Sequence, residues 1–131
     1  MSETKIYVFS GTFSCIEEAC LYSQPQWEPE PDESVSDDEY EKWEDSNPSH
    51  QLEKNIDSYL DEDFIETVDL NYEYLKSFKL SESDMDKVKE KSAGDNIFVL
   101  VFEDALGGFR LENEPKSTSQ LNFCGAYKCV L

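Results

Sequence analysis

The sequence has few of the residues that enzymes commonly use for nucleophilic or phosphate chemistry. Histidine occurs once in 131 residues, as His50, and no catalytic serine or cysteine motif accompanies it, although a nucleophilic triad needs a base beside its nucleophile. The motif G-x-S-x-G is absent, and neither Gly11 nor Gly107-Gly108 leads into the Lys-Ser/Thr pair of a phosphate-binding loop. We therefore expect a protein that is not an enzyme and that needs no cofactor.

Long apolar runs are also missing. No stretch approaches the ~18 apolar residues of a membrane helix, and residues 1–5 carry neither the basic region nor the apolar run of a signal peptide. These absences predict a cytoplasmic protein without a membrane partner. In that compartment thiols stay reduced, so the four cysteines are expected to act as small apolar residues.

The cysteine spacing argues against a metal site. Cys15/Cys20 and Cys124/Cys129 are each five positions apart. Five positions rotate a helical side chain by about 140° and place a strand residue on the opposite face of the sheet. An EF-hand loop starting at Asp61 fails as well, because Glu66 stands where the turn requires glycine. No metal is expected.

Basic residues are scarce. Eleven Lys and Arg face 30 Asp and Glu, for a net charge of −19, and the segment from residue 28 to residue 73 holds eighteen acids against two lysines, a net −16. Such a field repels nucleic acid and anionic membranes and attracts basic proteins. The alternative that the acids form only a solvated surface remains open, because net charge also governs solubility.

Aromatic residues, in contrast, make up 13% of the chain, enough to build much of the core of one domain. Strands are predicted at residues 5–9, at 96–102, which is apolar on both faces and hence central, and at 109–112 and 121–130, the last bent at Gly125. A turn at residues 61–66 leads into a weaker strand through Val68. Strands gathered near the end of the chain indicate an antiparallel sheet.

Helices are predicted between these strands. A capping box at Ser14 and Glu17 starts a helix to about Ser23, with inward-facing Ile16, Ala19, Cys20 and Ser23. Ser36 caps a second helix, which ends at Asn47-Pro48. Ser49 caps a third, amphipathic helix, whose apolar stripe consists of Leu52, Ile56, Tyr59 and Leu60. Ser81 or Ser83 caps a fourth helix, which runs to about Ser92 with Met85 and Val88 facing inward. The prediction is a single α+β domain over residues 1–131, an antiparallel sheet of four to five strands with helices mainly on one face. An acidic, proline-containing insert occupies residues 24–49.

Acidic side chains alternate with aromatic ones in the charged segment. Binding surfaces use aromatic anchors while charge steers the encounter. The candidate partner-binding residues that follow from this pattern are Trp27, Asp37, Asp38, Tyr40, Trp43, Asp61, Glu62 and Asp63. A core position is the favoured interpretation for Tyr59, and for Trp27 and Trp43 core and surface are equally open.

The chain also resembles a known family. The features that carry the resemblance are Gly11-Thr12-Phe13 after the first strand, the Glu17-Glu18 helix, the run Tyr-Leu-Asp-Glu-Asp-Phe-Ile-Glu at residues 59–66, and Gly125-Ala126-Tyr127 near the end. Together they are similar to the immunity protein 22 family of bacterial polymorphic toxin systems. The resemblance implies that the chain neutralises a cognate toxin by binding it, and it adds Phe64 to the candidates Asp61, Glu62 and Asp63.

Three functions are therefore considered. The first is an immunity protein for a basic toxin domain, such as a nuclease with a cationic cleft. The second is an acidic mimic of nucleic acid that inhibits DNA-binding proteins. The third, ranked last, is a small enzyme that uses a carboxylate pair.

Overall fold

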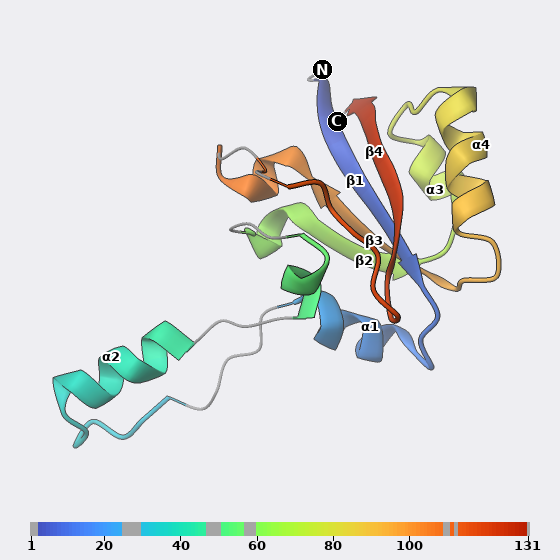
Figure 1. The fold of residues 1–131 in the computed structure, drawn as a ribbon. Helices are drawn as coiled ribbons and strands as arrows, with labels where there is room; N and C mark the ends of the chain where they lie inside the picture. Colours follow the sequence, from blue (N-terminus) through green and yellow to red (C-terminus); the bar gives the residue numbers. More distant parts are fainter. Residues whose placement is uncertain are drawn as a thin grey trace.

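The computed structural model describes residues 3–24, 30–46, 51–56, 60–108, 111 and 113–130. Within them, an antiparallel sheet of order β2-β3-β1-β4 forms the centre of the fold (Figure 1). Its strands are β1 (Glu3–Gly11), β2 (Ile65–Asp69), β3 (Ile97–Phe102) and β4 (Asn122–Val130). Every residue of β3 is buried, which explains its central place. The predicted α+β fold with an antiparallel sheet is confirmed.

Helices pack against both faces of the sheet, where mainly one face was expected. On one face, α3 (Tyr72–Lys76) and α4 (Glu82–Lys91) share a core with Ile6 and Val8 of β1. On the other, α1 (Ile16–Ser23) and the 3₁₀ turns η1 (Gln51–Lys54) and η3 (Glu103–Leu106) share a core with Tyr7 and Phe9. Alternate residues of a strand point to opposite faces, so two apolar sets on β1 require cover on both sides.

The helix signals were correct for α4 and partly wrong for α1. The Ser81 hydroxyl accepts a hydrogen bond from the N–H of Asp84 at 3.1 Å, and Met85 and Val88 are buried as predicted. In α1, however, the extended residue Cys15 precedes the first helical residue. Ser14 therefore lies one residue too early for the capping box, and its hydroxyl donates to Glu18 instead.

The inner face of α1 also differs from the prediction. Ala19 and Ser23 are buried as expected, and Tyr22 joins them. Ile16 and Cys20 are only partly buried.

The amphipathic helix expected after Ser49 is wrong over residues 51–56, which form η1 and a turn. Leu52 and Ile56 are buried as predicted, but the 3₁₀ turn ends at Lys54 and Asn55 lies in the turn that follows. Its amide donates to the carbonyls of Lys116 and Leu121 at 2.9 and 3.1 Å. Ser49 and Tyr59 lie outside the described residues, as does the strand expected at 109–112 except for Leu111, which is in no strand.

The bend predicted at Gly125 is confirmed, and it corrects the expectation for the cysteines. Gly125 has φ 119°, and the pairing of β1 with β4 shifts by one residue between Val8 and Phe9. A bulge inserts one extra residue and so reverses which face the next residues occupy. Cys124 and Cys129 are consequently buried in the same core instead of on opposite faces.

Candidate functional site

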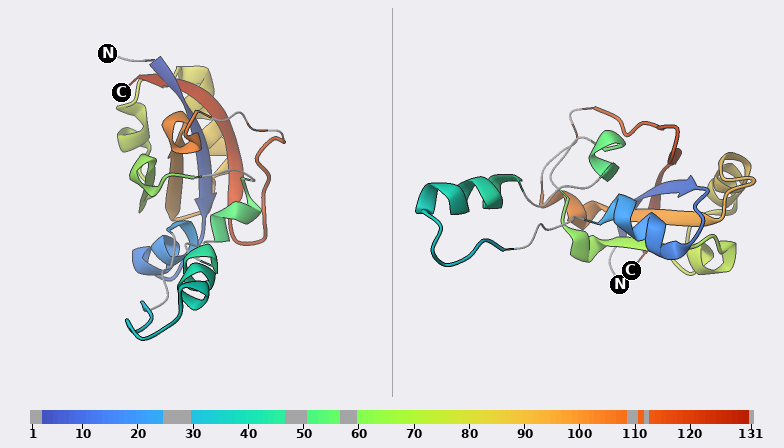
Figure 2. Two further views of the ribbon diagram at one scale, coloured as in Figure 1. Left: turned by 90° about the vertical axis from the view of Figure 1, so that its left-hand side faces the viewer. Right: turned by 90° about the horizontal axis from the view of Figure 1, so that it is seen from below.

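The acidic helix α2 (Asp37–Ser46) stands clear of the sheet, beyond α1 (Figure 1 and the right view of Figure 2). Ser36 caps it as predicted, because its hydroxyl accepts a hydrogen bond from the N–H of Glu39 at 3.3 Å. Asp37 and Asp38 lie in the first turn, where negative charge favours the helix dipole. Both are exposed, so α2 depends on local capping and charge more than on burial in the core.

Two aromatic rings lie among the carboxylates of α2. The ring centroids of Tyr40 and Trp43 are 5.4 Å apart, Tyr40 is 37% exposed, and Trp43 is half-buried. The Tyr40 hydroxyl donates to Glu30 at 3.4 Å. The negative charge of Glu30, followed by desolvation and the charge of Glu44, raises the pKa of Tyr40. The helix thus presents an aromatic pair inside a negative field, with Lys42 as its one base against six acids.

The run at residues 61–64 forms a tight corner before β2, through the 3₁₀ turn η2 (Glu62–Phe64). Asp61 is used within the corner: its N–H donates to the Ala105 carbonyl at 2.7 Å, and its carboxylate accepts from the N–H of Asp63 at 3.0 Å. Asp63 and Phe64 are exposed. The side chain of Glu62 is not among those the structure describes.

The predicted site residues therefore fall into two groups. Asp37, Asp38, Tyr40 and Trp43 share α2, whereas residues 61–64 share the corner beside η3. The two groups lie apart in the ribbon views (Figures 1 and 2), and α2 does not pack extensively on η2. Trp27 lies outside the described residues.

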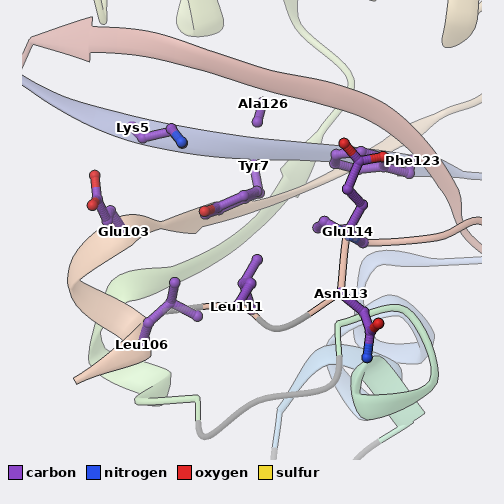
Figure 3. Close-up of a pocket in the computed structure, with 10 residues that line it drawn as sticks. Lys5, Tyr7, Glu103, Leu106, Leu111, Asn113, Glu114, Phe123 and Ala126 are labelled. Atoms are coloured by element: carbon purple, nitrogen blue, oxygen red, sulfur yellow. The ribbon is translucent and has the colours of Figure 1, made fainter. Parts of the chain in front are cut away.

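A further candidate site was not predicted. A cavity of about 730 Å³ opens on the α1 side of the sheet, over β1 and β4, with η3 as one wall (Figure 3). Its lining residues include Lys5, Tyr7, Glu103, Leu106, Glu114 and Phe123. The cavity exists because β1 and β4 pair with Tyr7 opposite Ala126. No local pattern signals a pairing between residues so distant in sequence.

The cavity contains a buried hydroxyl that the described residues leave without a hydrogen bond. Tyr7 is only 7% exposed, and its hydroxyl points toward the space between Lys5 and Glu103 (Figure 3). No hydrogen bond reaches this hydroxyl from the residues that the structure describes. Burial, and then the charge of Glu103, raises the pKa of Tyr7. The hydroxyl is therefore neutral at ordinary pH and available to a bound group.

Across the described part of the chain, no group of three or more His, Cys, Asp or Glu residues is arranged to hold a metal ion. In the same ranges, no helix has the length and apolar character to cross a membrane. No family model, curated protein or solved structure matches the chain. The function must therefore be inferred from the geometry of α2, the corner and the cavity.

Proposed function

We propose that this chain is an immunity-type protein that binds and neutralises a basic toxin domain, with α2 as its main contact. The observation that carries the proposal is the position of α2, which displays Tyr40 and Trp43 among six acids and one lysine, away from the sheet. A helix that contributes little to a core yet carries two large aromatic side chains is well suited to contact a partner.

Charge indicates the kind of partner. A protein of net charge −19 associates fastest with a cationic surface, and the association rate falls as salt screens the attraction. Nucleases have such surfaces in their substrate clefts. The resemblance of residues 59–66 to the immunity protein 22 family supports a toxin as the class of partner, and the exposed Asp63 and Phe64 offer a second contact region.

The test is a pull-down from the cells that make the protein, with a salt step for elution. The wild type should retain one basic toxin-domain protein that is released at high salt. A variant with Glu41→Lys and Glu44→Lys on α2 should lose it, since both residues are exposed. A Trp43→Ala variant should lose affinity with less change in salt dependence, because it removes an apolar anchor rather than charge.

The matched control is Asp86→Lys with Glu90→Lys on α4. These acids are exposed as well, and their reversal changes the net charge by the same amount at a site distant from α2. Retention by the α4 variant and loss by the α2 variant would support the proposal. Equal loss of the partner by both variants would show that net charge alone, and not α2, accounts for binding. Capture of several unrelated DNA-binding proteins would favour a nucleic-acid mimic.

A further inference from the structure

We propose that the cavity over β1 and β4 receives an arginine side chain from the bound partner. The inference rests on the proposed function and adds a second, specific contact to the one at α2. It is carried by the chemistry of the cavity, which combines an apolar floor, two carboxylates and a buried hydroxyl.

The apolar part of the cavity suits the stem of a long side chain. Phe123 of β4 lies in the floor, and Leu106 of η3 and Leu111 lie along one side (Figure 3). The volume of about 730 Å³ falls within the roughly 300–1,000 Å³ typical of ligand sites. Arginine buries its methylene groups against such surfaces while its charged end stays near polar groups.

The polar part of the cavity favours a cation. Glu103 and Glu114 contribute two negative charges to the lining and Lys5 one positive charge. Among the lining residues that the structure describes, the balance is therefore negative, in a chain that is itself strongly negative. The described residues provide no ion pair for either carboxylate, so both remain available to a guest.

The aromatic ring of Tyr7 already contacts a cation of the chain itself. The Lys5 ammonium nitrogen lies 6.0 Å from the ring centroid of Tyr7, at the limit of a cation–π contact. Lys5 therefore competes with an incoming cation for the same face. Removing its charge should strengthen binding, which gives the proposal a gain-of-affinity test.

The buried hydroxyl of Tyr7 selects arginine over lysine. A buried polar group without a hydrogen bond is a rare and unfavourable arrangement, and the Tyr7 oxygen can accept an N–H from a guest. A guanidinium has five donors in one plane, so it can donate to the Tyr7 hydroxyl and to the Glu103 carboxylate, which lie at the same end of the cavity (Figure 3), at the same time. A lysine ammonium is a compact, strongly hydrated point charge without this planar set of donors.

The experiment uses the full chain and a small probe, without the partner. ¹⁵N-labelled protein is titrated with N-acetyl-L-arginine amide at low salt, and amide shifts are followed at Tyr7, Phe123 and Ala126. N-acetyl-L-citrulline amide is the matched control probe, because it has the same length without the charge. We expect saturable shifts with the arginine probe and at least fivefold weaker binding of citrulline.

Variants locate the binding. Glu103→Gln with Glu114→Gln should weaken arginine binding about tenfold at the cavity, Lys5→Met should tighten it about threefold, and Asp86→Asn with Glu90→Gln on α4 should change it less than twofold. All of these side chains are exposed, so the variants should fold, and an unchanged spectrum away from the cavity checks this. Equal binding of citrulline, shifts confined to α2, or equal effects of the two double variants would overturn the proposal.

The outcomes separate this inference from the proposed function. Arginine binding in the cavity together with no basic partner in the pull-down would support the arginine site and refute the immunity role. A toxin domain captured through α2, with no arginine binding in the cavity, would do the reverse.

Discussion

Replacing Gly125 with alanine should destabilise the fold more than the same change at Gly94, which also has a positive φ. The φ of 119° at Gly125 lies where side chains are strained, and an added methyl group would lie 2.6 Å from Cζ of Tyr127. Backbone strain of this kind costs about 1–3 kcal/mol. The ring would also have to move, which breaks the bond from the Tyr127 hydroxyl to the Cys124 carbonyl, at about 1–3 kcal/mol for a buried unpaired group. The sum is about 2–6 kcal/mol.

Gly94→Ala is the matched control. Gly94 also has a positive φ, 88°, but a methyl group there would meet nothing within 4 Å. Only the strain of about 1–2 kcal/mol should remain. Urea unfolding measures both, and with m of about 2 kcal/mol/M the two midpoints should differ by roughly 1 M. Equal midpoints would show that the contact between residue 125 and the ring of Tyr127 adds no cost, which would refute the prediction.

Three further predictions address the core. Thiol labelling of the native protein, followed by mass spectrometry, should modify the exposed Cys15 first. Cys124 is buried, and burial raises the pKa of its thiol, so it should react only as the protein unfolds. Equal labelling rates at the two cysteines would contradict this packing. Burial and then a hydrogen bond to Glu66 raise the pKa of Tyr74 to about 12, above about 10 in the unfolded chain. The free energy of unfolding should therefore fall as pH rises from about 10 to 12. When unfolding is measured across this range, the free energy of unfolding of Tyr74→Phe should fall less than that of the wild type. Asn55→Ala removes three hydrogen bonds, of which the one accepted from Tyr22 and the one donated to Leu121 are buried and the one donated to Lys116 is partly buried. The loss should cost about 2–4 kcal/mol in urea unfolding; a cost below about 1 kcal/mol would contradict this role.

The fold could be predicted from sequence where local chemistry and tertiary packing agree. The strand at residues 97–102 is apolar on both faces and is buried on both, and the Ser81 cap lies directly before two inward residues of α4. Prediction failed where a tertiary contact competed with a local pattern. The stripe through Leu52 and Ile56 indicates an α-helix, yet Asn55 turns the chain toward partners more than 60 residues away.

The candidate site divides in the same way. The acidic helix with Tyr40 and Trp43 was visible in sequence because its charges, its cap and its aromatic spacing are all local. The cavity was not, since it depends on the register that sets Tyr7 opposite Ala126 and on η3 directly after β3. The cysteine expectation failed for a related reason, because a one-residue bulge reverses the face of every later residue in the strand.

The helix proposed to contact the partner is separate from the packed core that stabilises the fold. The charge of α2 lies on a helix outside both core clusters, so self-repulsion among its acids acts mainly on that helix and not on the packed sheet. The proposed basic partner would relieve this repulsion on binding, so that an unfavourable feature of the free protein would contribute to binding energy. Neutralising the acids of α2 should therefore reduce partner affinity while leaving the unfolding midpoint of the sheet nearly unchanged, whereas Gly125→Ala should do the opposite. If both changes altered affinity and stability together, the helix and the sheet would have to form one energetic unit, and α2 would be part of the fold rather than a contact displayed on it.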